Sequence, residues 1–405
     1  MPSSTTRWPP LVVDFTAAWA GPLCGAVLAD LGWTVVKIES ATRPDITRRL
    51  GPFADGIAGL ERSGYFDSLN RGKRSVALNL RTAEGQELAR ALSLEADVVV
   101  ENFSPGVMAR LGLDYSRLSA LKPALVMLSI SGYGATGPER DYVAYGQTIE
   151  AVAGLDAATG YPGAGPMASG SPLPDHVAGM TGAFAVLQAV DHQRRTGEGA
   201  YLDVSMLEAL LAMMPLHLFA FQLTGREPEP RANRDAAVAP HGCYPCLGED
   251  QWLALSAGSP AEWRALCAEL GLMGFLSDEA LLNASERLRR QDEIDPAIAA
   301  ATRTREAHAL VSRLRTAGVP ATVVAQGADL LDDETLRQRA FFTEVETTEA
   351  GPRVLTGRPA SFSFLAEPLR SAGPRLGEHT REILESVLGL SPAEIDGLDE
   401  RGILA

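Results

Sequence analysis

A carboxylate stands at the start of a long apolar helical pattern. Asp175 follows the Gly/Pro-rich stretch 132–174 and precedes HVAGMTGAFAVLQAV, which predicts a helix from about His176 to Arg194. An aspartate at an N-cap-like place contributes about 1 kcal/mol by accepting a backbone hydrogen bond. It can also serve as a nucleophile, because the helix dipole helps to keep it ionised. The spacing alone leaves both roles open.

A turn of small residues follows the first apolar run, LVVDF. In the sequence TAAWAGPLCG, Gly21 and Pro22 open a predicted helix. Backbone N–H groups at a helix start beyond a parallel strand can bind a phosphate or an oxyanion. The segment lacks GxGxxG, so it carries no dinucleotide fingerprint. A plain tight connection is the competing interpretation.

Positive charges gather near the ends of the predicted strands in an otherwise acidic chain. The sequence has 36 Lys+Arg against 51 Asp+Glu, a formal net charge of -15, which disfavours nucleic acid as a partner. A phosphate-bearing ligand therefore needs a local basic pocket. Five residues near strand ends could form this pocket, although each could instead be a solvated surface charge: Lys37, Arg71, Lys73, Arg74 and Arg110.

Two further features concern an aromatic residue and the cysteines. Asn102 and Phe103 leave a predicted strand in ENFSPG, where an amide beside an aromatic ring can bracket adenine or merely end the strand. The four cysteines are too few and too unevenly placed for a disulfide framework. Cys243 and Cys246 form CYPC, but no second CxxC or paired histidines accompany them. We expect no metal site, and two partly buried thiols flanking a turn.

The elements that must position these residues alternate between strands and helices. Their β-branched runs are apolar throughout, which is typical of strands buried on both faces of a parallel sheet. The sequence therefore predicts a doubly wound α/β fold. The expected strands are 11–15, 34–39, 75–80, 97–102, 125–131 and 201–205, and residues 206–223 predict one further apolar helix.

Composition divides the chain into three parts. Residues 1–224 carry the α/β pattern, and a polar, Pro-rich linker follows them. Residues 225–330 contain shorter helices and strands, which predict a small α+β domain. Residues 331–405 have little core of their own and must return to the first part or pack on another subunit. No run of about 18 apolar residues and no leader pattern is present, so we expect a cytoplasmic protein without a membrane partner.

Several motifs, taken in order, resemble the class III coenzyme A transferases of the CaiB/BaiF type. The group contains formyl-CoA:oxalate CoA-transferase, carnitine CoA-transferase and alpha-methylacyl-CoA racemase. The motifs include VVDFTAAWAGPLCG, FDSLNRGKRSVALNL, ADVVVENFSPG, LSISGYGATGP, PDHVAGMTGAFAVLQAV, RRTGEGAYLDVS and GPRLGEHTREIL. Each is weak alone, but their order is specific. The resemblance implies a large Rossmann-like domain built from both ends of the chain, a small inserted domain and an interlocked homodimer, with a heteromer as the alternative.

The resemblance also implies roles for single residues. Asp175 falls on the family's catalytic aspartate, which attacks an acyl-CoA and later carries CoA as an aspartyl thioester. The residues implied to hold coenzyme A are Ala17, Ala18, Trp19, Ala20, Lys73, Arg74, Asn102, Phe103 and Arg110. Those implied to line the substrate pocket or its covering loop are Tyr145, Gln147, Ser256, Ala257, Gly258 and Ser259. Coenzyme A and acyl-CoA are then substrates, and no prosthetic group is expected.

Two departures from the family bear on the substrate. The racemase branch carries a histidine where this chain has Tyr145, and the formyl-CoA branch carries a glutamate near Gly146 and a glutamine near Trp19. We therefore expect transfer of CoA from an acyl-CoA donor to a carboxylic acid other than oxalate. An acyl-CoA racemase or epimerase using His176 as a displaced base is one alternative. A non-catalytic CoA-binding subunit of a heteromer is the other.

Overall fold

The described residues form two units, which are treated separately below. The computed structural model describes residues 9–227, 229–347, 349–363, 365 and 371–405. Unit 1 comprises Met1–Asp156, Ala168–Glu227 and Thr335–Ala405, and unit 2 comprises Ala157–Met167 and Pro228–Glu334. Each unit is therefore built from segments that are separated in the sequence. Two short helices span the divisions, α7 (Leu155–Ala158) and α17 (Glu334–Gln338).

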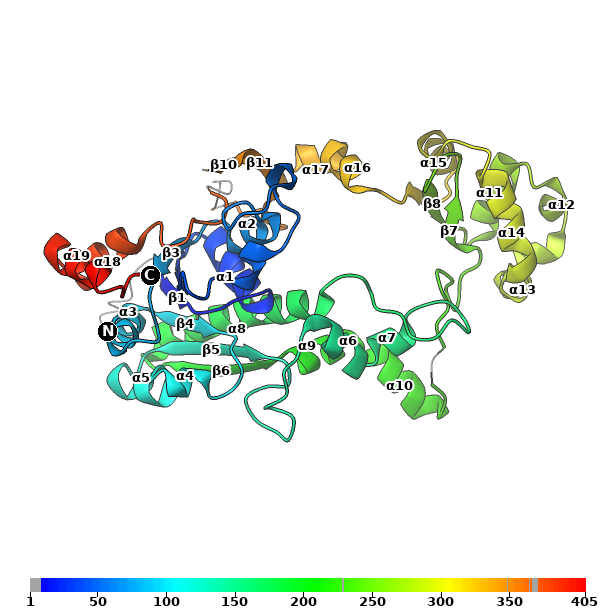
Figure 1. Cartoon of the computed structure of the whole chain (residues 1–405). Helices are drawn as coiled ribbons and strands as arrows, with labels where there is room; N and C mark the ends of the chain where they lie inside the picture. The colour runs from blue at the N-terminus through cyan, green and yellow to red at the C-terminus, as the bar shows by residue number, and fades with distance from the viewer. Residues whose placement is uncertain (1–8, 228, 348, 364, 366–370) are drawn as a thin grey trace. The chain divides into compact units, whose positions relative to one another are not determined.

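A six-stranded parallel sheet forms the centre of unit 1 (Figure 1). Its strand order is β3-β2-β1-β4-β5-β6, so the prediction of a doubly wound parallel sheet is confirmed. Because the order reverses between β1 and β4, the connections after these two strands diverge, which is where such folds bind ligands. The strands are β1 (Leu11–Asp14), β2 (Thr34–Glu39), β3 (Arg74–Ala77), β4 (Val98–Glu101), β5 (Val126–Ser131) and β6 (Ala200–Ser205).

Two long helices cover one face of this sheet. Helices α1 (Ala20–Asp30) and α8 (Leu173–Thr196) pack on each other and on the sheet, with α9 (Met206–Met213) beside them. Their close approach depends on glycine: a Cβ at Gly179 would lie only 2.6 Å from the Ala20 carbonyl oxygen. The absence of a side chain at Gly179 lets the start of α1 lie directly against the first turns of α8.

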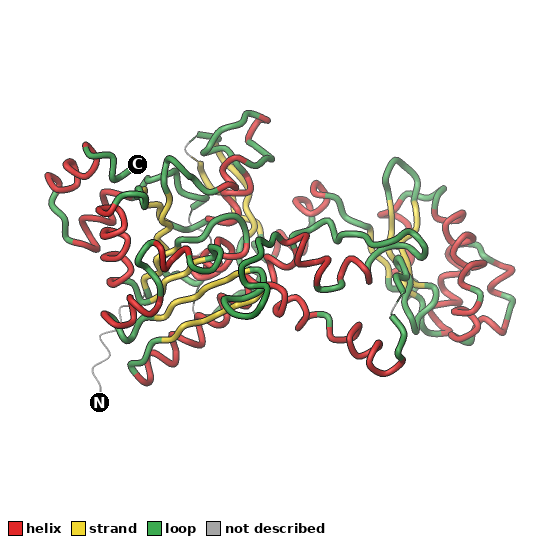
Figure 2. Tube along the Cα trace, turned by 60° about the horizontal axis from the view of Figure 1, so that its bottom comes forward, coloured by secondary structure: helices red, strands yellow, loops and turns green. Residues whose placement is uncertain are grey.

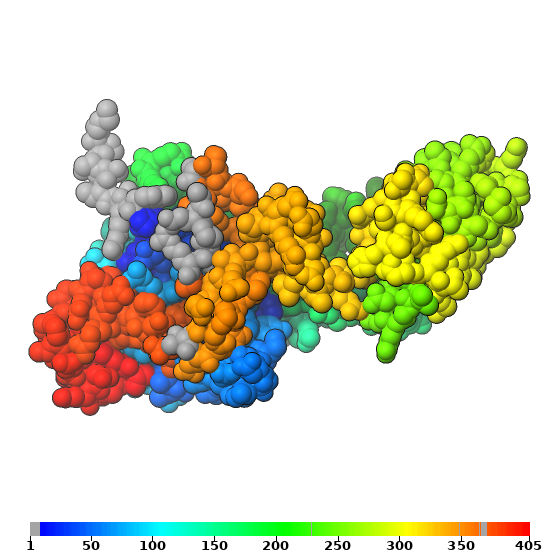
Figure 3. Space-filling model, turned by 90° about the horizontal axis from the view of Figure 1, so that it is seen from above, coloured from blue at the N-terminus to red at the C-terminus, as the bar shows by residue number. Residues whose placement is uncertain are grey.

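Residues from late in the chain help to cover the opposite face. Helices α3 (Ala83–Glu95) and α5 (Tyr115–Leu121) lie there with α18 (Thr380–Leu388) and α19 (Pro392–Glu400). Ile383, Leu384 and Ile395 belong to the same buried cluster as Leu11 and Val13 of β1. Figure 3 shows these C-terminal residues, in red, against the blue and cyan of the N-terminal part.

The remaining elements of unit 1 are short. An antiparallel hairpin joins β10 (Phe342–Thr347) to β11 (Gly351–Thr356). The other helices are α2 (Gly64–Asn70), α4 (Val107–Arg110), α6 (Gly146–Val152) and α10 (Pro215–Thr224), with 3-10 turns at Ile46–Arg49 and Ala54–Gly56.

The expectation of one helix over residues 206–223 is wrong. The chain bends by 68° between α9 and α10. Pro215 is the first residue of α10, where its missing N–H is harmless, whereas within a continuous helix it would remove a hydrogen bond. In the described part of the chain no single helix is long and apolar enough to cross a membrane, and only this bent pair passes that test of length and composition jointly.

Unit 2 combines a small antiparallel sheet with a group of helices (Figure 2). The sheet has the order β7-β8-β9, with β7 (His241–Pro245), β8 (Trp252–Ser256) and β9 (Ala321–Val323). Trp263 and Leu310 lie among the buried residues of its core. The helices are α11 (Pro260–Leu270), α12 (Met273–Leu276), α13 (Ala284–Arg289), α14 (Gln291–Thr302), α15 (Ala307–Thr316) and α16 (Gly327–Asp332), with a 3-10 turn at Glu279–Leu282.

The cysteines of unit 2 do not flank a turn as expected. Cys243 lies within β7 and Cys246 directly follows this strand, so the residues between them are extended. All four cysteines of the chain are free thiols. Among the described residues, no group of three or more His, Cys, Asp or Glu side chains could hold a metal ion.

Candidate active site

Asp175 lies in the first turn of α8 rather than at its N-cap. The helix begins at Leu173 with Pro172 as the N-cap residue, and no side chain caps it. The expectation of a capping aspartate is therefore wrong. Pro174 fits here because the N–H groups of a first turn have no partner within the helix. The Asp175 carboxylate remains close to the positive end of the helix dipole.

Two backbone segments enclose the Asp175 carboxylate. A Cβ at Gly146, the first residue of α6, would lie 2.3 Å from Asp175 Oδ2, so only glycine leaves room for this oxygen. The backbone N–H of Ala20 donates a hydrogen bond to the carboxylate from the start of α1. Burial raises the pKa of Asp175 to about 6, against the lowering effect of the Ala20 amide. At neutral pH the group is mostly ionised, as a nucleophile must be.

Aromatic rings lie beside this carboxylate. The Trp19 ring meets the His176 ring edge to face at 5.4 Å and the Tyr65 ring at 4.8 Å. Trp19 Nε1 is buried and has no hydrogen-bond partner within the described chain. His176 Nδ1 lies 2.9 Å from the Pro172 carbonyl oxygen. The residues next to Asp175 thus offer an indole N–H and an imidazole ring.

Most backbone N–H groups of the loop between β1 and α1 donate hydrogen bonds within the protein. Asn102 accepts from the Ala17 N–H and donates to the Ala17 carbonyl, both at 2.8 Å. The Ala18 N–H donates to Asp45 Oδ1 at 3.1 Å. The Ala20 N–H contacts Asp175, so three amides of this segment have partners within the protein, and a role of Ala17 to Ala20 in holding coenzyme A stays a prediction. Asn102 here positions the loop.

Four of the five cations expected to form a basic pocket make ion pairs within unit 1, and three of these pairs are buried, so phosphate binding by these residues stays a prediction. Buried cations require carboxylate partners, and these are supplied from distant parts of the sequence. The pairs are Lys37 with Asp45, Arg71 with Asp30, Lys73 with Asp14 and Arg74 with Glu382.

Lys73 and Arg74 differ in exposure, because the Lys73 side chain is buried whereas the Arg74 side chain is 43% exposed. The Lys73 side chain is completely buried and also donates to the Pro22 carbonyl and Asn70 Oδ1. Arg74 begins β3, at the amino edge of the sheet. Arg110, at the end of α4, is exposed and has no ion-pair partner in the described part of the chain. Of the five predicted cations, Arg74 and Arg110 have side chains that an anionic ligand could reach.

The remaining predicted residues lie in three places. Phe103 is partly exposed directly after β4, and its N–H donates to the Glu101 carboxylate at 2.8 Å. Tyr145 and Gln147 are exposed on either side of Gly146, so the start of α6 brings them close to Asp175. In unit 2, Ser256 ends β8, and residues 257–259 connect it to α11.

The loop 256–259 is tied down within unit 2. Glu262 accepts hydrogen bonds from the N–H groups of Gly258 and Ser259 at 2.8 and 2.9 Å. Arg287, which is completely buried, donates to the carbonyls of Ala257 and Gly258. This loop therefore has fixed partners on both its donors and its acceptors.

Sequence reasoning missed two buried carboxylates near these segments. Glu150 of α6 is 1% exposed and accepts a hydrogen bond from Ser169 Oγ at 2.7 Å. Glu101, at the end of β4, is 6% exposed, and burial raises its pKa to about 7 despite hydrogen bonds from Ser129 and the Phe103 amide. The available signal was the position of Glu101 directly before Asn102, on a strand that is otherwise apolar.

Comparisons with known proteins agree on one family. The family model for CoA-transferase family III matches residues 11–380. The chain is 32% identical over 393 residues to the succinyl-CoA–D-citramalate CoA-transferase of Chloroflexus aurantiacus, covering 97% of this chain and 96% of that protein. It is 31% identical over 392 residues to the succinate–glutarate CoA-transferase of Agrobacterium fabrum, covering 95% and 97%.

The fold comparison gives the same result. The structure resembles the crystal structure of a CaiB/BaiF family protein from Brucella suis with a TM-score of 0.86 at 30% sequence identity. The likeness covers 94% of this chain and 98% of that protein.

Proposed function

We propose that this chain, which belongs to CoA-transferase family III and exchanges coenzyme A between acyl-CoA thioesters and carboxylic acids, does so through an aspartyl-CoA thioester on Asp175. One observation carries the proposal. A partly exposed carboxylate, with its pKa raised to about 6 by burial, is enclosed by the Ala20 amide and by the backbone of Gly146. Such a group is ionised at neutral pH and is only weakly solvated, which favours nucleophilic attack.

The reaction can be written without any net change in protons. An Asp175 oxygen attacks the acyl-CoA carbonyl, the C–S bond breaks and a mixed anhydride forms. The released thiolate attacks the aspartyl carbonyl, which expels the donor acid and leaves the aspartyl-CoA thioester. The acceptor carboxylate attacks that thioester and again releases the thiolate. Attack of the thiolate on the acceptor's acyl carbon gives the new acyl-CoA and restores Asp175.

The neighbouring residues supply positioning rather than acid–base chemistry. The Ala20 N–H favours the ionised form of Asp175 and limits its orientation. Trp19, with its unpartnered indole N–H, and the exposed Tyr145 and Gln147 are our proposed pocket residues. For coenzyme A, we retain Phe103 and Arg110 as proposed direct contacts.

A labelling experiment tests the nucleophile. The enzyme is treated with an acyl-CoA without acceptor and then with hydroxylamine, and peptide mass spectrometry locates the resulting hydroxamate. We expect it at position 175, and we expect Asp175→Ala to form none and to lose transferase activity. Asp191→Asn is the matched control, because Asp191 lies on the same helix, is exposed and pairs only with Arg195 in the described chain. Full transferase activity in Asp175→Ala would reject the assignment.

The racemase alternative predicts a different product. His176 lies beside Asp175 and could act as a base. Incubation of an acyl-CoA in D₂O without acceptor should then introduce deuterium at the α-carbon, whereas CoA transfer alone introduces none. We expect no exchange.

The names of two relatives suggest which acids to try first. Both relatives are named for succinyl-CoA or succinate together with a second dicarboxylic acid. We propose that this chain also uses a dicarboxylyl-CoA donor. A panel of succinyl-CoA, acetyl-CoA and propionyl-CoA, each with mono- and dicarboxylate acceptors, checks this by mass spectrometry of the products. Faster transfer from acetyl-CoA would contradict it.

The exposed apolar side chains of unit 1 support an interlocked homodimer. On α10, Leu216 and Leu223 are 78% and 85% exposed, and on α8 Phe184 is 66% exposed. Large side chains of this kind are usually covered in a stable protein. We propose that a second copy of this chain covers them. A heteromeric partner is the alternative outcome.

We also propose that the boundaries at 225 and 330 separate the folding units.

A further inference from the structure

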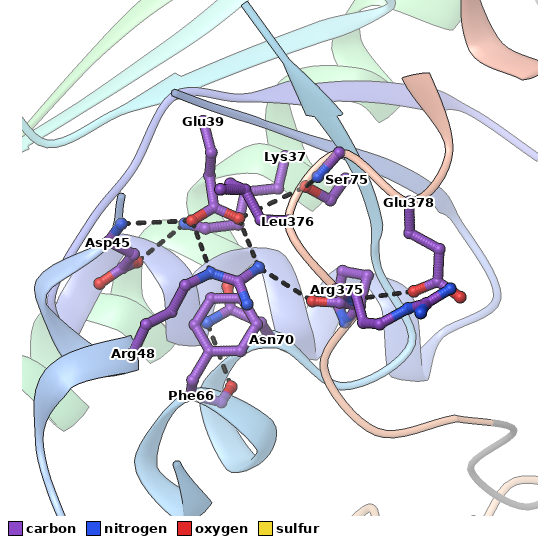
Figure 4. Close-up of polar contacts among 12 residues, drawn as sticks. Lys37, Glu39, Asp45, Arg48, Phe66, Asn70, Ser75, Arg375, Leu376 and Glu378 are labelled. Carbon is purple, nitrogen blue, oxygen red and sulfur yellow. Dashed lines mark hydrogen bonds and ion pairs between the residues drawn. The ribbon is translucent and has the colours of Figure 1, made fainter. Parts of the chain in front are cut away.

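Buried charges hold the loop between β1 and α1. Lys37, on β2, is 0% exposed and donates a hydrogen bond to the Thr16 carbonyl at 2.6 Å. Its ammonium also forms an ion pair with Asp45 Oδ2 at 2.9 Å. Figure 4 shows this pair beside a second buried pair, Glu39 with Arg48. Desolvation makes such charges costly, so their retention in the core requires an explanation.

Asp45 connects this pair to the backbone of Ala18. Asp45 Oδ1 accepts hydrogen bonds from the Ala18 N–H at 3.1 Å and from the Thr47 N–H at 3.0 Å. Burial by itself would raise the pKa of Asp45, but Lys37 and the Thr47 amide bring this pKa below its usual value. Asp45 therefore stays ionised and acts as a fixed acceptor for the loop.

The residue that Asp45 holds has an unfavourable backbone conformation. Ala18 has φ of 67°, in the left-handed region, which costs a residue with a Cβ about 1–2 kcal/mol. Such strain persists only where the surroundings determine the conformation. Two residues later, the Ala20 N–H meets Asp175 and the Ala20 carbonyl lies against Gly179. A shift at Ala18 would therefore move the amide that contacts Asp175.

We propose that Lys37 and Asp45 are positioning residues for the reaction, which fix Ala18 and thereby hold the Ala20 amide on the Asp175 carboxylate. The inference rests on the proposed role of Asp175 as nucleophile. Neither residue needs to touch a substrate, since both act through the loop.

The consequence is a dependence of catalysis on pH. A hydrogen bond to an ionised carboxylate favours that form, so loss of the Ala20 contact raises the pKa of Asp175 above 6. The acid limb of the kcat profile, where Asp175 becomes protonated, then moves to higher pH. The other titratable groups that influence Asp175 are His176 on α8 and Glu150 on α6. Their hydrogen bonds are to Pro172 and Ser169 and not to Lys37 or Asp45, so we expect both to stay in place when the pair is changed.

Two double variants separate the positioning role from simple loss of stability. Lys37→Met/Asp45→Leu removes every contact of the pair with the loop and leaves no unpaired buried charge, an exchange that folds tolerate well. Lys37→Met/Asp45→Asn restores an oxygen that can accept the Ala18 N–H. Each is assayed as pure, folded protein for kcat and KM across pH 5 to 9. Glu61→Gln is the control, because Glu61 pairs with Arg48 in the same network but makes no contact with the loop.

We expect the Leu variant to move the acid limb upward by about one pH unit and to lower kcat at pH 6 about 5-fold, with KM for acyl-CoA unchanged. In the Asn variant, kcat at pH 6 and the midpoint of the acid limb should lie between those of the Leu variant and the parent. In Glu61→Gln, both should equal the parent values. A folded Leu variant whose acid limb of kcat has the same midpoint as that of the parent would overturn the proposal. Should the Leu variant not fold, an Asn variant with unchanged kcat and midpoint would overturn the role of the ion pair. Activity in Asp175→Ala would instead contradict the nucleophile on which the proposal rests.

Discussion

At the scale of residues, Asp175 could be proposed as the nucleophile from the sequence, whereas its surroundings could not be predicted. Asp175 was identifiable because an ordered set of motifs surrounds it. The ion pairs of the predicted cations could not be predicted, because a sequence does not show which carboxylate a buried cation will contact. Lys73 meets Asp14 across 59 positions, and only the sheet brings them together. The same holds for Gly146, whose missing side chain makes room for a carboxylate 29 positions later, from Gly146 to Asp175.

The raised pKa of Asp175 predicts a cost in stability. The ionised group is disfavoured in the folded state, where its pKa is about 6, relative to the unfolded chain at 3.8. Protonation of Asp175 therefore stabilises the folded state. This contribution is fully present below pH 3.8 and is lost as the pH rises through about 6. We expect Asp175→Asn to stabilise the protein by about 1–3 kcal/mol at pH 7.5 and to give no gain below about pH 4. Thermal unfolding at several pH values measures this, and an equal gain at pH 4 and 7.5 would contradict it.

At the scale of elements, the hydrophobic pattern of the sequence predicted the strands of the large sheet well, but it did not predict where a helix is interrupted. The β-branched runs predicted all six strands of the sheet, although β3 ends at Ala77 rather than at residue 80. The apolar run 206–223 has helical periodicity throughout, and Pro215 ends one helix and begins the next. In addition, β7 was not predicted, because its five residues include glycine and proline and lack a clear alternation.

The close approach of α6 to α8 predicts the effect of a single methyl group. Gly146→Ala places its Cβ 2.3 Å from Asp175 Oδ2, so the carboxylate or the start of α6 must move. A displacement of about 1 Å at a reacting group costs up to roughly 100-fold in rate, so we expect kcat to fall about 10- to 100-fold in a folded protein. Steady-state kinetics measures this. Gly274→Ala is the control, since a Cβ there meets nothing within 4 Å, and equal activity in both variants would refute the argument.

At the scale of the whole molecule, the apolar surface of unit 1 predicts association. Besides Leu216 and Leu223, the α10 helix exposes Leu218, Phe219 and Phe221 by 49%, 55% and 47%. Exposed apolar surface of this extent usually marks a site that binds another protein surface. The sequence could not reveal the face, because the same residues would be typical of a buried core helix.

Charges placed on this face should separate the copies. We expect Leu216→Lys/Leu223→Glu to convert the parent dimer to monomer, because both charges would be buried without partners in the interface. Light scattering after size exclusion measures the mass. Leu121→Lys, at an isolated side chain of α5 that is 60% exposed, should leave the mass unchanged. A parent protein that is already monomeric would contradict the proposed homodimer.

The return of the last helices to the sheet has a consequence for synthesis on the ribosome. The core that contains β1 also contains Ile383, Leu384 and Ile395, and the Asn79 N–H donates to the carbonyl of Ile403. A nascent chain that has emerged as far as residue 334 possesses all of unit 2 but lacks the helices that complete one face of the sheet. The inserted unit can therefore fold during translation, while the unit that carries Asp175 must wait until translation is almost finished.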